Sequence, residues 1–364
     1  MRVLLLSRYG DLGASSRVRY LQYLGDFQER GWTVEISPLF SNAYLQALYA
    51  GRGRFRETVR GYLRRLYALL RARKFDVLII EKELFPFLPA WFERVLAQLN
   101  VPYVVDYDDA LFHRYDLHRR AVVRGLLGRK IDAVMRHSAL VIAGNEYLAD
   151  RARAAGAQRI EIIPTVVDTD RYQAAAKRAE GPLVVGWIGT PKTSRYLQPL
   201  VPVFERLHRD LGVRFVAVGA RAANFVGTPV EAWPWSEETE VSSIQQFDIG
   251  IMPLEDSPWE RGKCGYKLIQ YMACGLPVVA SPVGVNREIV EDGRNGFLAS
   301  ATDDWMETLK ELAGNGEQRA AMGAHGRRKV ETWYSRAAQA PRVIDVMREA
   351  AEKPENRIDR KGQG

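Results

Sequence analysis

Residues 262–281, GKCGYKLIQYMACGLPVVAS, decide the fold class of this chain. They predict a glycine loop, then a helix of about two turns ended by a glycine, then a buried strand. The helix ends in the small residues Ala273–Gly275, so we expect it to pack closely on a sheet. Lys263 and Lys267 stand four residues apart and share one face near the helix start, which favours an anionic partner.

The same alternation of strand and helix extends along the whole chain. Such alternation indicates parallel strands joined by crossover helices, so we expect two doubly wound α/β units in tandem. Two units of this kind would place the carboxyl ends of their strands across a common cleft. The expected strands are 3–6, 32–37, 77–80, 103–105, 140–143 and 160–163 in the first unit, and 183–187, 214–218, 249–252 and 277–280 in the second.

The length of 364 residues exceeds one ordinary core of about 250–300 residues, which supports two domains. A polar stretch of small residues, 174–181, predicts the linker between them. We expect domains at 1–175 and 176–335, followed by a helix and a charged tail over 336–364.

The composition excludes several classes of protein. Hydrophobic residues make up 47% and charged residues 26% of the chain, which excludes a wholly disordered, collagen-like or coiled-coil protein. There is no uncharged apolar run of about 18 residues and no signal-peptide pattern at the start, so we expect a cytoplasmic protein. Cys264 and Cys274 lie ten residues apart, which fits neither a disulfide framework nor a zinc or redox motif, so we expect buried thiols.

Positive charge is concentrated in the first half of the chain. Residues 1–180 hold 29 Lys and Arg against 20 Asp and Glu, and the densest part, 51–74, has nine basic residues and one acid. This segment predicts a basic amphipathic helix, either resting on anionic lipid or packed with a solvated basic face. Nucleic acid is a third alternative, but no reader motif accompanies the charge, so we do not expect nucleic acid as a partner. The expected apolar residues are Tyr62, Leu66, Leu69 and Leu70, surrounded by Arg60, Arg64, Arg65, Arg71 and Arg73.

The loop after the first strand contains small residues just before a helix. These are Gly10, Gly13, Ala14, Ser15 and Ser16. They would let main-chain N–H groups approach a phosphate or a sugar, or they form a tight turn capped by serines. The spacing is not the Gly-x-Gly-x-x-Gly fingerprint, which argues against a nicotinamide dehydrogenase.

Three carboxylates, Asp106, Asp108 and Asp109, follow the strand 103–105. Crowded carboxylates repel each other, and this cost is usually accepted for a ligand, a proton or a metal. The alternative is that one aspartate caps the following helix while the others face water. A metal site is disfavoured, because no histidine or further acid stands nearby at a recognisable spacing.

A second polar loop, 186–195, follows the first strand of the second unit and precedes a helix. Lys192 and Arg195, together with small hydroxyl residues at a helix start, suit a diphosphate.

The run 267–281, with Gly284, Glu288 and the turn 292–297, resembles the donor-binding signature of glycosyltransferase family 4. Segments 144–146, 163–168 and 247–254 also resemble parts of that family. The resemblance implies the GT-B architecture, in which two Rossmann-like domains face a central cleft and a C-terminal helix crosses back to the first domain. It implies an acceptor bound by residues 1–175, a nucleotide sugar bound by residues 176–335, transfer with retention at the anomeric carbon, and no essential metal or other cofactor.

The sequence departs from the family's pattern at three positions. The arginine of the usual diphosphate clamp falls at Gly189, which leaves Lys192 and Arg195 as candidates. Two glutamates that the family places eight residues apart fall at Gly262 and Gln270, of which Gln270 can keep a neutral contact to the ribose.

Other residues compensate for these departures under the same resemblance. Lys263 and Lys267 supply charge, since a subset of the family has a lysine three residues before the second acid, as Lys267 stands before Gln270. The histidine of the family's first-domain loop is replaced by Asp108 or Asp109.

We therefore expect a retaining glycosyltransferase of polysaccharide or glycolipid synthesis, with a UDP-sugar or GDP-sugar donor, a saccharide or lipid-linked acceptor, and an anionic membrane surface as a partner through 51–74. Asp108 or Asp109 would orient the sugar or the acceptor hydroxyl. The diphosphate would meet Lys192, Arg195, Lys263, Lys267 and the N–H groups of Gly265 and Tyr266. The alternatives are a nucleotide-sugar epimerase of the same architecture and a non-catalytic protein that binds a nucleotide sugar or nucleic acid.

Overall fold

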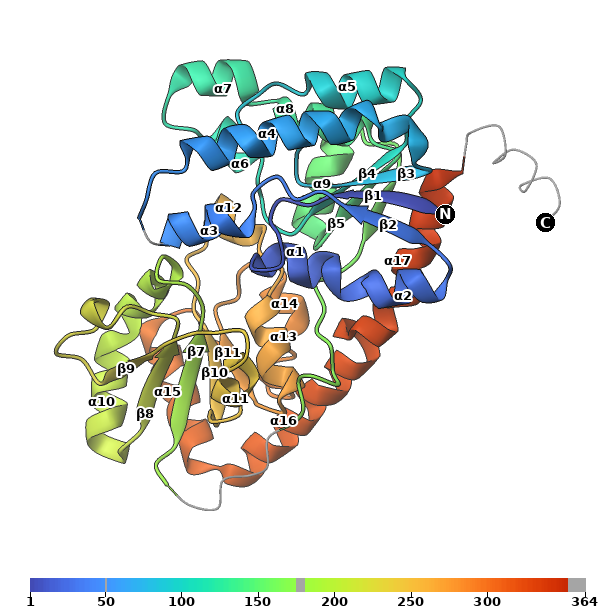
Figure 1. Ribbon diagram of the computed structural model, residues 1–364. Coiled ribbons are helices and arrows are strands. Elements are labelled where there is room, and N and C mark those ends of the chain that lie inside the picture. Colours follow the sequence, from blue (N-terminus) through green and yellow to red (C-terminus); the bar gives the residue numbers. More distant parts are fainter. Residues whose placement is uncertain (50, 175–180, 353–364) are drawn as a thin grey trace. The chain divides into compact units, whose positions relative to one another are not determined.

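The computed structural model describes residues 1–49, 51–174 and 181–352, which form two compact units (Figure 1). The first unit comprises Met1–Thr165, Gly262–Cys264 and the residues from Gln339 on, and the second comprises Val166–Arg261 and Gly265–Ala338. The chain therefore leaves the second unit for three residues and then returns to it. Most of the expected linker, 175–180, and the expected charged tail lie outside the described residues.

The first unit is built on a parallel sheet, whose six strands in the described part of the chain have the order β2-β1-β3-β4-β5-β6. The strands are β1 (Arg2–Leu6), β2 (Thr33–Ile36), β3 (Val77–Glu81), β4 (Tyr103–Tyr107), β5 (Leu140–Ala143) and β6 (Ile160–Ile162). Each predicted strand is present. β3 and β4 run further than predicted, because pairing continues to Glu81 opposite Asp106 and to Tyr107 opposite Ala143. Asp106 is therefore a sheet residue, where we had expected a loop.

Helices cover both faces of this sheet. Its helical segments are α1 (Ala14–Arg19), η1 (Leu21–Tyr23), α2 (Leu24–Glu29), α3 (Asn42–Tyr49), α4 (Phe55–Leu70), η2 (Ala72–Lys74), α5 (Trp91–Gln98), α6 (His113–Asp116), α7 (Ala121–Leu127), α8 (Lys130–His137) and α9 (Glu146–Ala155). α17 (Arg336–Ala351) begins in the second unit and continues in the first, as predicted. The single helix expected after β1 is broken into three segments, because Tyr20 leaves the helical conformation at φ −136°.

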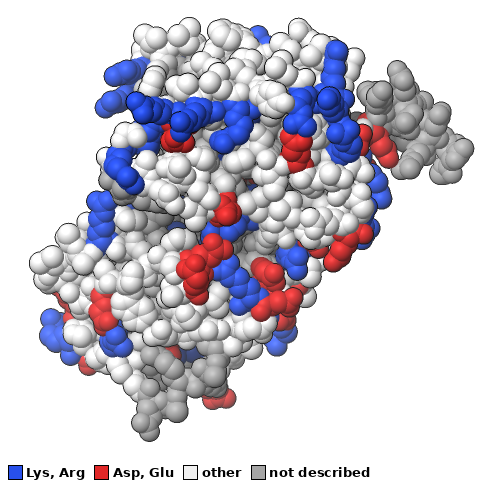
Figure 2. All heavy atoms as spheres, in the orientation of Figure 1, with Lys and Arg blue, Asp and Glu red and all other residues white. Residues whose placement is uncertain are grey.

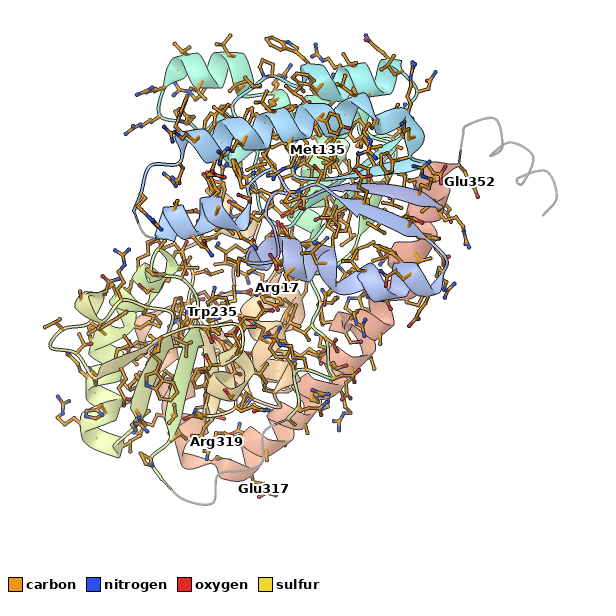
Figure 3. All side chains as sticks on the ribbon, in the orientation of Figure 1. Arg17, Met135, Trp235, Glu317, Arg319 and Glu352 are labelled. Carbon is orange, nitrogen blue, oxygen red and sulfur yellow. The ribbon has the colours of Figure 1, made fainter. Side chains whose placement is uncertain are left out.

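Successive side chains of a strand point to opposite faces of the sheet, so the first sheet packs against one layer of helices on each face. Leu4, Leu6 and their neighbours pack with α4, α5, α8 and α9, and Met135 of α8 is fully buried in this layer (Figure 3). The other face meets α1, η1 and α17, as Tyr20, Tyr23 and Val343 show where they surround a cavity of about 10 Å³.

The second unit has the same construction. Its parallel sheet has, among the described residues, six strands in the order β12-β11-β10-β7-β8-β9. The strands are β7 (Val184–Ile188), β8 (Arg214–Val218), β9 (Val230–Trp233), β10 (Ile249–Met252), β11 (Val278–Ala280) and β12 (Gly296–Leu298). We did not predict β9 and β12, which are edge strands of four and three residues and too short to show a hydrophobic period.

Helices also cover both faces of the second sheet. α13 and η5 pack on one face, and α10 and α15 pack on the other. The segments are η3 (Thr193–Leu200), α10 (Val201–Leu211), η4 (Ala222–Asn224), α11 (Glu240–Ile244), α12 (Pro258–Arg261), α13 (Tyr266–Ala273), α14 (Asn286–Ile289), α15 (Thr302–Gly314), α16 (Gly316–Lys329) and the π-helix η5 (Val330–Tyr334). The predicted end of α13 is confirmed, because Gly275 takes a left-handed φ of +74°. Both cysteines are buried free thiols, as expected.

The basic helix α4 differs from expectation on its inner face. Arg65, expected around the solvated face, is 1% exposed and donates hydrogen bonds to the carbonyl oxygens of Ser7 and Ser37 at the ends of β1 and β2. Tyr62 and Leu69 pack against the core. Other apolar side chains of α4 point to solvent instead, namely Phe55, Val59, Leu63, Leu66, Tyr67 and Leu70.

Candidate functional site

The order of the strands indicates where ligands can bind. In doubly wound sheets, ligands bind outside the carboxyl ends of the strands where the direction of winding reverses. In the first sheet this reversal lies between β1 and β3, and in the second it lies between β7 and β10. The candidate site residues of the first unit therefore lie in the loops after β1, β3 and the neighbouring strand β4. Those of the second unit lie in the loops after β7 and β10.

Asp106 is part of the sheet's interior. It is completely buried, and Arg19 of α1 binds it with two nitrogens, of which Nε lies 3.0 Å from Oδ2. Arg19 also donates a hydrogen bond to the carbonyl oxygen of Ile163. The pair joins α1 to β4, so Asp106 supports the fold and leaves the ligand-binding role to the two later aspartates.

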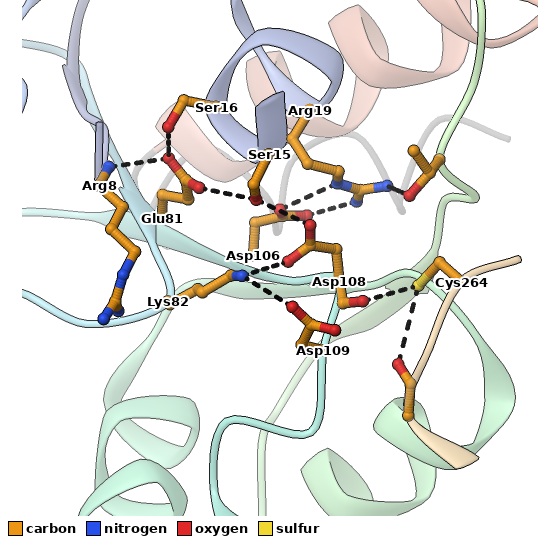
Figure 4. Close-up of polar contacts among 12 residues, drawn as sticks. Arg8, Ser15, Ser16, Arg19, Glu81, Lys82, Asp106, Asp108, Asp109 and Cys264 are labelled. Carbon is orange, nitrogen blue, oxygen red and sulfur yellow. Dashed lines mark hydrogen bonds and ion pairs between the residues drawn. The ribbon is translucent and has the colours of Figure 1, made fainter. Parts of the chain in front are cut away.

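Asp108 has both carboxylate oxygens engaged (Figure 4). Lys82 Nζ lies 2.7 Å from Oδ1, and the hydroxyl of Ser15 lies 2.8 Å from Oδ2. Burial alone would raise the pKa of Asp108, but the charges of Lys82 and Arg19 outweigh burial and lower that pKa to about 2. Asp108 is therefore ionised at neutral pH and is held in place on both sides.

Asp109 differs from Asp108 in its exposure. Its side chain is 34% exposed, and Lys82 Nζ lies 3.3 Å from its Oδ2. Its other oxygen, Oδ1, has no hydrogen-bond partner among the described residues. The structure thus separates two aspartates that sequence reasoning left equivalent, since Asp109 alone offers an oxygen to a ligand.

The glycine loop before α1 supports these carboxylates. A Cβ on Gly13 would lie 2.3 Å from Cβ of Tyr9, so the loop needs glycine there, and Ala14 begins α1. The Ser15 hydroxyl lies between Asp108 Oδ2 and Oε1 of Glu81, at 2.8 and 3.0 Å. The Ser15 hydroxyl has one proton, so it can donate a hydrogen bond to only one of the two carboxylates at a time. Ser15 thus connects Asp108 and Glu81.

Sequence reasoning missed the charged run Glu81–Glu83, which begins at the last residue of β3, directly after the apolar residues 77–80. Lys82 takes a left-handed backbone conformation at φ +70° and is 6% exposed. Glu83 is 2% exposed and forms an ion pair with Lys130 at 2.6 Å. Three charged residues directly after this apolar run were the signal that would have found them.

The segment Gly262–Cys264 packs against the loops of the first unit, to which it belongs. Asn145 Nδ2 donates a hydrogen bond to the Lys263 carbonyl oxygen at 2.9 Å, and the Cys264 thiol lies 3.2 Å from the Asp108 carbonyl oxygen. The side chain of Lys263 is half-buried. The same strand-end loop that carries Asp108 is thus in contact with the three residues that lead into α13.

In the second unit, the loop after β7 and the start of η3 carry two predicted cations. Lys192 is exposed just before η3. Arg195 has a side chain 57% exposed, stacks on the Tyr196 ring and lies 3.6 Å from Glu260 Oε1. Glu260, which sequence reasoning did not select, is 3% exposed and accepts a hydrogen bond from the Tyr196 hydroxyl.

The first turn of α13 and the loop after β7 both contact the ring of Trp187. Lys267 Nζ lies 5.6 Å from the centre of the Trp187 ring, and a Cβ on Gly189 would lie 2.4 Å from that ring. Gly265, at φ +64°, precedes the helix, and a Cβ there would lie 2.2 Å from Ile289 Cδ1. The N–H groups of this first turn are those that a helix leaves unpaired within itself.

Gln270, predicted to contact a ribose, lies in a buried polar cluster. It is 3% exposed, and its Nε2 donates a hydrogen bond to the Tyr172 hydroxyl at 2.9 Å. The Tyr172 hydroxyl donates to Glu240 and lies 3.5 Å from that of Tyr266. Burial raises the pKa of Tyr172. The amide nitrogen of Gln270 is thus engaged within the unit.

Packing explains two of the departures from the family's pattern. A Cβ at Gly262 would lie 2.5 Å from Ala110 Cβ and 2.7 Å from the Ala110 nitrogen, so a glutamate there would force the Ala110 backbone to move. At Gly189 the Trp187 ring occupies the space that an arginine side chain would need.

Comparison with known families covers most of both units. Residues 28–171 match the family described as Glycosyltransferase Family 4, and residues 182–315 match the family described as Glycosyl transferases group 1.

Curated relatives match over part of the chain. A D-inositol 3-phosphate glycosyltransferase of Corynebacterium urealyticum is 28% identical over 51% of this chain and 49% of its own length. The same enzyme of Mycobacteroides abscessus is 30% identical over 45% and 42%. A GDP-mannose-dependent alpha-(1-6)-phosphatidylinositol monomannoside mannosyltransferase of Mycolicibacterium smegmatis is 29% identical over 42% and 38%. The chain thus spans about half or less of the length of these relatives.

Solved structures resemble the whole chain. Sucrose-phosphate synthase of Thermosynechococcus elongatus has a TM-score of 0.70 at 14% identity, covering 96% of this chain and 98% of that one. HepE of Anabaena in complex with UDP has a TM-score of 0.67 at 15% identity, covering 96% and 100%. This likeness confirms the predicted GT-B fold.

The packing of Gly262 yields a stability prediction. We expect Gly262→Glu to lower the free energy of unfolding by about 1–3 kcal/mol, because its Cβ overlaps the Ala110 backbone. Gly25→Ala is the control, since a Cβ on that helical glycine meets nothing within 4 Å, and we expect it to leave stability equal or slightly higher. Denaturant unfolding measures both, and a Gly262→Glu midpoint equal to that of the wild type would contradict the packing argument.

Proposed function

The chain belongs to glycosyltransferase family 4, and from this premise we propose that it moves a sugar from a nucleotide-diphosphate sugar to a saccharide or lipid-linked acceptor, with retention at the anomeric carbon. The observation that carries the proposal lies in the second unit, which matches the group 1 glycosyl transferases. There, Lys267 at the first turn of α13 and Gly189 in the loop after β7 both lie beside the Trp187 ring.

We propose a UDP-sugar as the donor. HepE structures contain UDP and UDP-glucose, while the mannosyltransferase of Mycolicibacterium smegmatis is named for GDP-mannose. A thermal-shift comparison of UDP, GDP and their sugars decides between the two nucleotides.

Leaving-group stabilisation is the proposed role of the second unit. As the bond between the anomeric carbon and the phosphate oxygen breaks, negative charge builds on the diphosphate. Fixed cations and the N–H groups at a helix N-terminus stabilise that charge more than they stabilise the intact donor. We assign this role to Lys192, Arg195, Lys267 and the N–H groups of Gly265 and Tyr266, with Gln270 beside the ribose. Lys263, which the sequence also suggested for this role, lies in the short segment of the first unit that leads into α13.

Orientation of the acceptor is the proposed role of the first unit. In this proposal Asp109 Oδ1 accepts a hydrogen bond from the acceptor hydroxyl, while Asp108 binds the same lysine, Lys82, as Asp109 does. The acceptor oxygen bonds to the anomeric carbon as the phosphate oxygen departs, and the acceptor proton passes to that phosphate oxygen. This route needs neither a strong protein base nor a metal ion.

The donor proposal predicts the effect of one substitution. Lys267→Ala should lower kcat/KM for the donor by about 10²-fold or more, because a cation at the leaving group is lost. Lys310→Ala, which changes an exposed lysine of α15 in the same unit, should leave it unchanged. The measurement is release of the nucleoside diphosphate from the sugar nucleotide that the thermal shift selects.

Equal turnover by Lys267→Ala and the wild type would remove this lysine from the site. Conversion of the donor to an isomeric sugar without any acceptor would identify an epimerase instead.

We further propose that α4 brings the protein to an anionic membrane surface, where a lipid-linked acceptor would lie. Apolar side chains at helical spacing point away from the core of the unit, with Phe55 81%, Leu63 61%, Tyr67 61% and Leu70 85% exposed. A surface helix normally turns its apolar face inward, so this outward stripe favours a second apolar phase.

Basic residues flank the outward stripe of α4. Arg56, Arg60, Arg64, Arg73 and Lys74 are exposed. Figure 2 shows a row of Lys and Arg side chains over the region of α4. Apolar insertion together with basic residues is the combination that binds anionic lipid. No helix in the described ranges is both long and apolar enough to cross a bilayer.

Vesicle binding tests this role of α4. We expect sedimentation with vesicles containing phosphatidylglycerol but little with neutral phosphatidylcholine vesicles. Arg56→Glu with Arg60→Glu should weaken that binding roughly 30-fold or more, since each basic residue near the surface contributes about 1 kcal/mol. The control, Arg206→Glu with Arg209→Glu on α10, changes two exposed arginines of the other unit. Equal binding to both kinds of vesicle would contradict the proposal.

A further inference from the structure

Lys82 holds an unfavourable backbone conformation at a strand end. Its φ of +70° lies in the left-handed region, where residues other than glycine are uncommon. Its N–H still donates to the Asp106 carbonyl oxygen at 3.0 Å, which continues the pairing of β3 with β4. Strained residues persist only where the surroundings hold them, and they cluster at functional sites.

The strain places a buried ammonium group between two carboxylates. Lys82 is 6% exposed, and its Nζ lies 2.7 Å from Asp108 Oδ1 and 3.3 Å from Asp109 Oδ2 (Figure 4). A single carboxylate would neutralise the charge of the buried lysine, so the burial of Lys82 does not by itself explain the second carboxylate. The two aspartates differ in what remains, because Asp108 Oδ2 faces Ser15 while Asp109 Oδ1 stays open to a ligand.

We propose that Lys82 is a positioning residue for the acceptor: it fixes Asp108, draws one oxygen of Asp109 inward, and so aims Asp109 Oδ1 at the acceptor hydroxyl. This inference rests on the proposed function and adds to it a residue that no family motif pointed to. Lys82 touches neither reacting group itself, since its ammonium group is occupied by the two aspartates.

Other charged and titratable groups face the two aspartates and contribute to any pH effect. These are Arg19 and Ser15 on α1, Glu81 at the end of β3, Asp106 on β4 and the Cys264 thiol. Replacing Lys82 leaves all of them in place, so a change in the behaviour of the aspartates can be assigned to the lost ammonium group.

Kinetics of Lys82→Met, Lys82→Arg and the control Lys130→Met test the inference. The assay follows UDP release from UDP-glucose with octyl glucoside as the acceptor, or GDP release from GDP-mannose if the thermal shift selects GDP. Lys130 matches Lys82 because it is also buried in the first unit and forms an ion pair, with Glu83. We expect Lys82→Met to raise KM for the acceptor and lower kcat at least tenfold, Lys82→Arg to recover part of the loss, and all three variants to keep the nucleotide-induced thermal shift.

The pH dependence separates positioning from a merely structural role. The charge of Lys82 lowers the pKa of Asp108, so the pKa of that carboxyl group rises when Lys82 is replaced. The acid limb of the kcat profile should therefore move to higher pH in Lys82→Met and stay in place in Lys130→Met. If Lys82→Met does not fold, Lys82→Gly, which suits the left-handed backbone, replaces it in the same comparison.

The failures are distinguishable. Acceptor kinetics and an acid limb unchanged in an active Lys82→Met or Lys82→Gly would overturn this inference alone. Absence of any nucleotide-induced shift and of turnover in the wild type would overturn the proposed function, and this inference with it.

Discussion

Carboxylates crowd the carboxyl edge of the first sheet, and buried cations make that crowding tolerable. Asp106 is paired with Arg19, while Asp108 and Asp109 share Lys82. A buried charge without a partner would cost several kcal/mol, so each pair depends on the parallel strands that bring β3, β4 and α1 to one edge. Of these three aspartates, Asp109 is the one whose Oδ1 has no hydrogen-bond partner among the described residues.

The proposed site residues of the second unit are basic, whereas those of the first unit are acidic. The proposed ligand of the second unit is a diphosphate, and the groups that we propose for it are cations after β7 and the lysine and N–H groups at the first turn of α13. The segment Gly262–Cys264 connects the two sets of residues along the chain. It packs on the loop that carries Asp108, and the next residues form α13. Gly262 is needed for that packing, which accounts for the missing glutamate.

Sequence patterns were sufficient for the two parallel sheets and for ten of their twelve described strands, because buried parallel strands are continuous apolar runs separated by helices. The family followed from the motifs of the run 267–281. They were insufficient for Arg65, since a helical wheel cannot show that strand-end carbonyls lie beneath that arginine. They also left Asp108 and Asp109 equivalent, because Lys82, which distinguishes them, stands 26 residues from Asp108 in the chain and meets it only through the pairing of β3 with β4. Edge strands and ion pairs depend on tertiary contacts that no local period records.

Hydrogen–deuterium exchange of the full chain, with and without saturating UDP or GDP, tests the location of the donor most directly. The proposed clamp predicts slower exchange at the first turn of α13 and in the loop after β7, while the amides of α4 and α10 exchange as before. Protection that is confined to the first unit, with none at Gly265–Lys267 or in the loop 189–195, would contradict a diphosphate held by the second unit.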